Sequence, residues 1–276
     1  DSPTVNEIGA CQVFIQDMPA LMAKLKEHGI YTIARVVAFR DPYLAEQKPE
    51  WSLHVADGKI YRDNKGLAWV NPYKKEVWDY LIEVGKRAGE AGFDEIQFDY
   101  IRFAVDKTMN DVVFDDADTQ GRDKTQAITE FIGYAHDELA KEGLFVSADV
   151  FGTIMRSEED AAAVGQEYED MAEQLDYICP MIYPSHYGPG NFGIEYPDTQ
   201  PYDTILNALN GSRELLAASA KEDAPQAVVR PWLQDFTASY LEHYIKYGDE
   251  QVRQQIQAVY DAGYDQWILW DAGVSY

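Results

Sequence analysis

The sequence predicts an α/β fold of the TIM (β/α)8-barrel type, and three observations indicate it. Short apolar β-rich runs alternate with helical segments along all 276 residues, as in parallel sheets with right-handed crossovers. The composition does not change abruptly anywhere, so residues 1–276 are expected to form a single barrel domain. No glycine-rich turn follows a strand, which argues against the alternative, an open doubly wound sheet. Six strands can be recognised, whereas a closed barrel has eight.

The first predicted elements follow an ambiguous stretch, residues 1–16, in which residues 11–15 are either a short strand or a packed loop. Asp17 has the character of a helix N-cap with a proline close behind it, which predicts a helix over 19–27. Gly29 ends that helix. The run 31–39 is rich in β-branched residues and predicts the first strand.

A long connection, residues 43–70, precedes the next helix. Asn71 followed by proline is typical of a helix start, so a helix is expected to run from there to about residue 90. Gly92 supplies the left-handed conformation that ends it. The stretch 92–103 then reads as a short strand that follows the helix.

Polar residues occupy every second position of this strand. Glu95, Gln97 and Asp99 share one face, and the intervening residues are apolar. Buried parallel strands are normally apolar on both faces. The polar face therefore needs a functional reason, and Asp99 at the strand's C-terminal end is the candidate.

The rest of the chain repeats the alternation of strands and helices. Residues 104–122 are polar and acidic and are expected to form a solvated loop. Residues 184–201 are expected to form a second, Pro/Gly/Tyr-rich loop. The remaining strands are expected at 144–150, 176–183, 228–233 and 264–270, and the remaining helices at 124–141, 157–174, 202–219 and 248–262.

The charge balance limits the partners that the chain can have. It carries 48 acidic and 23 basic residues, a net charge of −25, which argues against nucleic acid and anionic lipid as partners. No run of about 18 apolar residues occurs, so no membrane-spanning segment is expected. Cys11 and Cys179 do not form a disulfide framework. Cys179 lies in an apolar run and is expected to be buried.

Several catalytic classes lack their motifs. The sequence has neither a G-x-S-x-G elbow nor a Walker loop, and its five histidines show no HxH or HExxH spacing. What remains is a set of carboxylates at predicted C-terminal strand ends. They are Asp41, Asp99, Asp149, Asp235 and Asp271.

Asp149 resembles Asp99 in its setting, because Ser147 and Asp149 share one strand face. If their strands are adjacent, the two carboxyl groups lie about 5 Å apart. A separation of about 5–5.5 Å is typical of retaining glycosidases, in which one carboxylate attacks and the other acts as acid and then base. The residues alone leave open which carboxylate has which role.

Arg35 and Glu95 lie in mid-strand, where an unpaired charge would be costly. We expect them to lie close enough for an ion pair or a shared hydrogen-bonding network. The simpler interpretation is that this network is structural and does not contact substrate.

Several motifs together resemble the putative glycoside hydrolase family DUF4015, which is similar to the α-amylase-like clan of TIM barrels. The central one is G-F-D-E-I-Q-F-D-Y-I-R-F, residues 92–103. The others are I-A-R-V-V-A-F-R-D-P (33–42), W-V-N-P (69–72), V-S-A-D-V-F-G (146–152), P-M-I-Y-P-S-H-Y (180–187), R-P-W-L-Q-D-F (230–236) and W-I-L-W-D-A (267–272).

The resemblance implies that Asp99 ends the fourth barrel strand and acts as nucleophile, and that Asp149 ends the fifth strand and acts as acid/base. It also implies that the first two barrel strands lie upstream of residue 1, so that the barrel in this chain is N-terminally truncated. Ala104 stands where the family's signature usually has proline, and Asp271 stands where it usually has asparagine.

The side chains expected to contact substrate sit at or just past predicted strand ends. Tyrosine and tryptophan would stack on sugar rings, and arginine, glutamine and histidine would bond to hydroxyl groups. They are Arg40, Asp41, Gln97, Arg102, Tyr183, His186, Trp232, Gln234 and Asp271.

The leading hypothesis is therefore a glycosidase that cleaves an oligo- or polysaccharide without a cofactor or metal. The alternatives are a barrel that binds carbohydrate without cleaving it or serves as a cell-surface structural module, and a metal-dependent hydrolase or deacetylase using Asp41, Asp99 and His186. A location outside the cytoplasm or at the cell surface is favoured. The sequence does not predict the sugar, the linkage or the oligomeric state.

Overall fold

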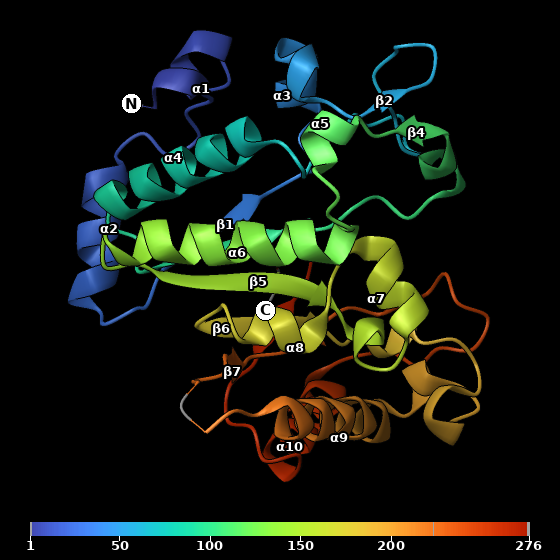
Figure 1. The fold of residues 1–276 in the computed structure, drawn as a ribbon. Helices are drawn as coiled ribbons and strands as arrows, with labels where there is room; N and C mark the ends of the chain where they lie inside the picture. The colour runs from blue at the N-terminus through green and yellow to red at the C-terminus, as the bar shows by residue number, and fades with distance from the viewer. Residues whose placement is uncertain (1, 223, 275–276) are drawn as a thin grey trace. The chain divides into compact units, whose positions relative to one another are not determined.

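A computed structural model describes residues 2–222 and 224–274, which form two compact units. The first unit comprises Asp1–Ala148 and Ala162–Glu167, and the second comprises Asp149–Ala161 and Tyr168–Tyr276. Figure 1 shows the elements of both.

Three parallel strands form the sheet of the first unit. They are β1 (Ile33–Val37), β3 (Glu95–Asp99) and β5 (Phe145–Phe151), and the division between the units falls within β5. In the register of β1 and β3, Val37 lies beside Asp99. In the register of β3 and β5, Phe98 lies beside Ala148.

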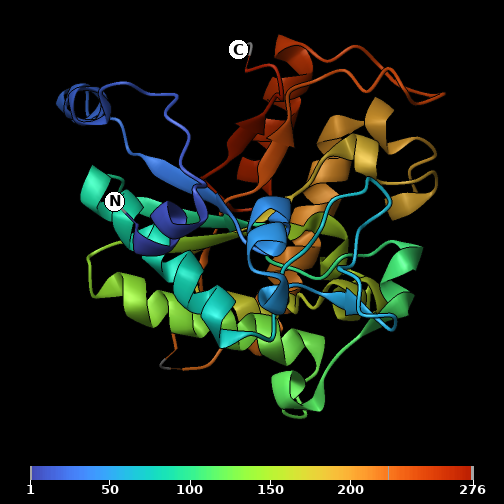
Figure 2. The ribbon, with the colours of Figure 1, turned by 90° about the horizontal axis from the view of Figure 1, so that it is seen from above.

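Two long helices lie side by side over the strands of the first unit, α4 (Lys75–Ala91) and α6 (Lys124–Ala140) (Figures 1 and 2). Asp123 caps α6 through a capping box with Gln126, which satisfies helix-terminal N–H groups. The shorter helices of this unit are α1 (Pro3–Ile8), α2 (Met18–Glu27), α3 (Pro42–Gln47) and α5 (Asp116–Thr119).

A small antiparallel pair is built from the two long connections of the first unit. Strand β2 (His54–Val55) comes after β1, strand β4 (Val112–Val113) comes after β3, and the two pair with each other. Because both connections leave the C-terminal ends of their strands, the pair lies at that end of the unit (Figure 2). The interpretation of 104–122 as a plain solvated loop was wrong, because β4, α5 and a 3-10 turn lie within it.

The second unit repeats the pattern with shorter strands. Its strands are β6 (Tyr177–Met181), β7 (Val228–Val229), β8 (Trp232–Gln234) and β9 (Ile268–Trp270). Strand β6 pairs in parallel with β7 and β8, and β8 pairs in parallel with β9. Its helices are α8 (Tyr168–Ala172), α9 (Pro201–Ser219) and α10 (Asp249–Asp261), and α9 and α10 lie side by side (Figure 1).

Two predicted helices differ from the structure. Helix α4 begins at Lys75, because Asn71 Oδ1 accepts the N–H of Tyr73 at 3.0 Å and forms a turn instead of a helix cap. The helix expected over 157–174 is divided into α7 (Glu158–Val164) and α8. Gly165 between them has φ +77°, and a Cβ there would lie 2.9 Å from the carbonyl oxygen of Lys124, so only glycine fits.

Two further expectations are corrected by local chemistry. The strand expected over 228–233 is interrupted at Pro231, because proline has no N–H for a ladder bond. Residues 11–15 form no strand, and the side chains of Val13 and Phe14 are exposed. Cys179 is buried, as predicted.

No helix in the described part of the chain, residues 2–222 and 224–274, is long and apolar enough to cross a membrane.

Candidate active site

Asp99 ends β3 with its carboxylate held on both oxygens. The residue is 6% exposed. Its Oδ1 accepts the N–H of Tyr100 at 2.6 Å, and its Oδ2 forms an ion pair with Arg35. Tyr100 has φ +50°, a left-handed conformation that costs a non-glycine residue about 1–3 kcal/mol and is concentrated at functional sites. The turn at Tyr100 ends the strand and fixes the direction of the Asp99 carboxylate.

Arg35 forms an ion pair that the sequence analysis did not anticipate. Arg35 lies beside Gln97 in the register of β1 and β3, and its side chain reaches the carboxylate of Asp99. Glu95 is fully buried and accepts hydrogen bonds from Tyr31 Oη at 2.9 Å and from the hydroxyl of Ser147. Arg35 therefore places a positive charge beside the candidate nucleophile.

Arginines and aromatic rings surround Tyr100. The guanidinium carbon of Arg40 lies 4.7 Å from the Tyr100 ring centroid, and that of Arg102 lies 5.2 Å from the ring centroids of both Tyr100 and Trp69. Asp63 accepts the Trp69 indole N–H at 3.1 Å and lies 3.4 Å from Arg40 Nε. Burial lowers the pKa of Arg102 to about 10, so it is charged at neutral pH.

The predicted residues Arg40 and Arg102 are thus brought together near Asp99, whereas Trp69, Tyr100 and Asp63 were missed. Trp69 lies in one of the motifs quoted above, but no pattern links it to Tyr100. The left-handed backbone at Tyr100 has no signal in sequence either, because glycine or asparagine is the usual residue there.

Asp41 and Gln97, the other two predicted residues of the first unit, contact neighbouring parts of the protein. Asp41 is the N-cap of α3 and accepts the N–H of Leu44 at 2.9 Å. Burial raises the pKa of Asp41. Gln97 is buried in the middle of β3, between Arg35 and Ser147 in the two strand registers.

Asp149 in the second unit is oriented by Trp232. The residue is 2% exposed, and its Oδ1 accepts the indole N–H of Trp232 at 2.6 Å. The Trp232 ring packs against Trp270 with a centroid separation of 5.6 Å and belongs to the same apolar cluster as Tyr183. The predicted stacking residue Trp232 therefore also holds a candidate catalytic carboxyl group.

We predict that Trp232→Phe lowers kcat by about 10-fold, since a hydrogen bond to a charged group is worth about 1.5–3 kcal/mol. The phenyl ring keeps most of the packing, so KM should change less. Steady-state kinetics measure both values. Trp267→Phe is the matched control, because the Trp267 indole bonds to Tyr260 Oη at 3.3 Å instead. Equal losses in the two variants would contradict a positioning role for Trp232.

The side chain of Gln234 is hydrogen-bonded to other residues of the protein. Its Oε1 accepts the N–H of Ser185 at 3.0 Å, and its Nε2 donates to Asp198 Oδ1 at 2.9 Å and to the carbonyl of Phe236 at 3.1 Å. The side chain thereby joins three loop segments to β8. Asp198 was missed by the sequence analysis, because it lies in the loop 184–201 away from any strand end.

The remaining predicted residues lie in loops of the second unit. The His186 ring lies 5.1 Å from the Tyr183 ring, and burial lowers the pKa of His186. Asp271 follows β9 and its Oδ1 accepts the N–H of Gly273 at 3.0 Å.

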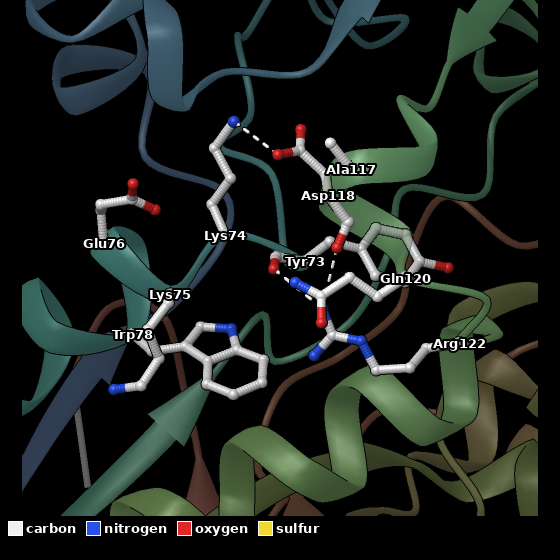
Figure 3. Close-up of a pocket in the computed structure, with 9 residues that line it drawn as sticks. All are labelled: Tyr73, Lys74, Lys75, Glu76, Trp78, Ala117, Asp118, Gln120 and Arg122. Carbon is white, nitrogen blue, oxygen red and sulfur yellow. Dashed lines mark hydrogen bonds and ion pairs between the residues drawn. The ribbon is translucent and has the colours of Figure 1, made fainter.

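The first unit has a polar cavity of about 410 Å³ whose lining includes Lys74, Lys75 and Arg122 (Figure 3). The contacts of Arg122 indicate that it stabilises the fold rather than binding a ligand. Lys74 Nζ lies 2.8 Å from Asp118 Oδ1. Arg122 donates to the carbonyls of Asp118 at 2.8 Å, Thr119 at 3.0 Å and Tyr73 at 3.3 Å. The Arg122 guanidinium thus connects α5 to the residues that precede α4.

We predict that Arg122→Ala lowers the free energy of unfolding by about 2–3 kcal/mol, because it leaves several carbonyls without their charged donor. Urea unfolding followed by circular dichroism measures the change. Arg62→Ala is the control: Arg62 is half exposed and pairs with Glu46 at 2.9 Å, so its loss should cost less than about 1 kcal/mol. A loss at Arg122 no greater than at Arg62 would refute the structural role.

Within residues 2–222 and 224–274, no group of three or more His, Cys, Asp or Glu side chains is arranged to hold a metal ion. The metal-dependent alternative therefore has no ligand set in this part of the chain.

Comparisons with solved structures bear on the fold. A hypothetical protein from Ruminiclostridium thermocellum is 41% identical, with a TM-score of 0.48 over 54% of this chain and 73% of that chain. The glycoside hydrolase domain of PgaB (BpsB) from Bordetella bronchiseptica is 10% identical, with a TM-score of 0.57 over 90% of this chain and 72% of that chain. The α-galactosidase TtGalA from Thermus thermophilus is 12% identical, with a TM-score of 0.55 over 91% of this chain and 46% of that chain.

The likenesses to the PgaB domain and to the α-galactosidase confirm the predicted fold class. The last two proteins are TIM-barrel glycosidases, and at such low identity they show the fold alone. This chain spans less than half the length of the α-galactosidase. No curated protein matches the chain.

The family comparison covers the entire sequence. The model of the putative glycosyl hydrolase domain DUF4015 matches residues 1–276, which include every motif that suggested the family. The chain belongs to the putative glycosyl hydrolase family DUF4015.

Proposed function

We propose that this protein hydrolyses O-glycosidic bonds of an oligo- or polysaccharide by a retaining mechanism, with Asp99 as nucleophile and Asp149 as acid/base catalyst. The observation that carries the proposal is the setting of Asp99. A buried carboxylate ends a central strand, pairs with Arg35 and is fixed by a left-handed turn. Such a group is held in one orientation before substrate arrives, as a nucleophile should be.

The register of β3 and β5 supports the choice of the second carboxyl group. Phe98 and Ala148 are paired, and Asp99 and Asp149 each follow one of them in the chain. Retaining glycosidases hold their two carboxyl groups about 5–5.5 Å apart, and the proposal requires that separation here.

The proposed reaction has two steps. In the first, an Asp99 oxygen attacks the anomeric carbon while the Asp149 carboxylic acid protonates the departing glycosidic oxygen. In the second, the Asp149 carboxylate removes a proton from water, which attacks the anomeric carbon and releases Asp99. The Trp232 indole N–H on Asp149 Oδ1 keeps the carboxyl group oriented through both steps.

Two roles in this reaction belong to the arginines. Arg35 balances the charge of Asp99 before attack and after release. Arg40 and Arg102, held against Tyr100, are proposed to bond to sugar hydroxyls at the same strand end. Planar guanidinium groups suit this task because their donors have fixed directions.

Release of reducing ends from a panel of polysaccharides tests the proposal. The wild-type protein should hydrolyse at least one glycan, and Asp99→Asn and Asp149→Asn should not. Binding of a glycan without any release would favour the non-catalytic carbohydrate-binding barrel instead.

A further inference from the structure

A cavity in the second unit is separate in sequence from the strand-end carboxylates. It has a volume of about 310 Å³ and is formed by the loop that follows β6 and by the segment 241–243. This volume lies at the lower end of the range for small-molecule sites, about 300–1,000 Å³. It suits one ring of a ligand at a time.

Stacked rings form part of the cavity wall. The Tyr196 and His243 ring centroids lie 3.9 Å apart at an interplanar angle of 36°, and both residues line the cavity. A sugar ring presents C–H groups on its faces, and these pack well on the electron-rich face of an aromatic ring. Closely packed rings at a cavity are therefore suited to a saccharide unit.

Two carboxyl groups contribute to the polar part of the lining, which also contains Ser185, His186 and His243. Asp198 is 2% exposed and accepts the amide of Gln234 at 2.9 Å and the N–H of Ile245 at 3.3 Å. A carboxylate has about four acceptor positions, so Asp198 keeps acceptor capacity beyond these two bonds. Burial raises the pKa of Asp198. Glu242 also lines the cavity, and neither lysine nor arginine does among the described residues.

This lining discriminates among sugars. Hydroxyl and ammonium groups donate to carboxylates, whereas the carboxylate of an acidic sugar would be repelled by Asp198 and Glu242. Because neither lysine nor arginine is among its described lining residues, the cavity has no permanent positive charge to offset that repulsion.

A chain of contacts connects the cavity with Asp149. Trp232 donates to Asp149, and Trp232 and Tyr183 belong to one apolar cluster. The Tyr183 ring packs on His186, which lines the cavity. All of these residues lie in the second unit.

We propose that the cavity bounded by Tyr196, His243, Asp198 and Glu242 is a subsite for a neutral or amine-bearing sugar unit of the glycan chain. The identification of the ligand as a saccharide rests on the proposed function. The subsite extends that function in two ways. It predicts a substrate of several sugar units rather than a monosaccharide glycoside, and it excludes polyuronates.

Isothermal titration calorimetry in the Asp99→Asn background, where hydrolysis cannot interfere, tests the subsite. The probes are tetrasaccharides from cellulose, xylan and galactan, from chitosan, and from polygalacturonate. At least one neutral or amine-bearing probe should bind, and the polygalacturonate probe should not. Binding of polygalacturonate alone, or of no probe, would overturn the assignment.

Substitutions at the cavity decide whether that binding occurs there. Adding Tyr196→Ala should raise Kd at least about 10-fold, equivalent to about 1.4 kcal/mol. Tyr240→Ala is the matched control, because Tyr240 is 70% exposed and lies outside the cavity lining. If chitosan tetrasaccharide binds, Glu242→Gln should weaken it more than any neutral probe. A Kd unchanged by Tyr196→Ala would overturn the subsite.

The two proposals fail in different ways. If the wild-type protein hydrolyses a glycan but Tyr196→Ala does not change the Kd, the subsite is refuted and the glycosidase proposal stands. Binding that depends on Tyr196, in a protein that hydrolyses no glycan, would uphold the subsite and refute the catalytic function.

Discussion

Asp99→Asn is expected to lower kcat by about 10³-fold or more, while the protein folds and binds glycan as before. Asparagine has nearly the same shape as aspartate and can still accept the Tyr100 N–H. It lacks the charge and the nucleophilicity that attack on the anomeric carbon requires. The substitution removes a carboxylate that acts in the transition state rather than in substrate binding. The value of kcat should therefore fall by a larger factor than KM rises. Initial rates on the glycan found by panel screening measure both.

The stability of Asp99→Asn should change little. The partner of Asp99, Arg35, has 39% of its side chain exposed, so water can solvate the guanidinium once the carboxylate is gone. Asp235→Asn is the matched control. Asp235 directly follows β8, whereas Asp99 is the last residue of β3. Asp235 has no proposed catalytic role, so kcat should stay within about 2-fold. Retention of a tenth or more of the wild-type rate by Asp99→Asn would contradict the assignment.

Asp149→Ala is expected to give a loss that depends on the leaving group. An unactivated glycosidic oxygen needs a proton from the acid catalyst, so its hydrolysis should slow by about 10²–10⁴-fold. A dinitrophenyl glycoside departs as a stable anion without that proton, so its first step should proceed almost normally. Water then attacks slowly for want of a general base, and the glycosyl-enzyme accumulates.

Added azide separates this account from simple damage to the fold. Azide is an anion that attacks without losing a proton, so it should restore turnover of Asp149→Ala on the dinitrophenyl substrate. The product should be a glycosyl azide with the configuration of the substrate, identified by nuclear magnetic resonance. Equal losses on both substrates, with no effect of azide, would exclude Asp149 as acid/base catalyst.

The core of the fold could be predicted because its signals are local. Alternation of apolar and polar residues predicted β3, and the structure buries both of its faces. The signal failed where a side chain competed with the backbone. Asn71 forms a turn instead of capping α4, and Pro231 divides a run of β-branched and aromatic residues into β7 and β8.

The candidate site was predictable in its strand-end residues but not in their partners. Asp99 was recognisable because a carboxylate follows a strand at the end that carries active sites in barrels. The ion pair between Asp99 and Arg35 depends on how far a long side chain reaches along the sheet, which strand patterns do not encode. Gln234 and Asp41 look like ligand-binding residues in sequence, yet both bond to nearby backbone N–H groups.

The most direct test of the central claim is to identify the residue that becomes glycosylated. A 2-deoxy-2-fluoro glycosyl fluoride of the sugar that the protein hydrolyses forms the covalent intermediate but slows its breakdown, because fluorine destabilises the positive charge of the second transition state. After proteolysis and mass spectrometry, the account predicts the sugar on the peptide that contains Asp99. A sugar on another carboxylate, or a product of inverted configuration with no adduct, would contradict it.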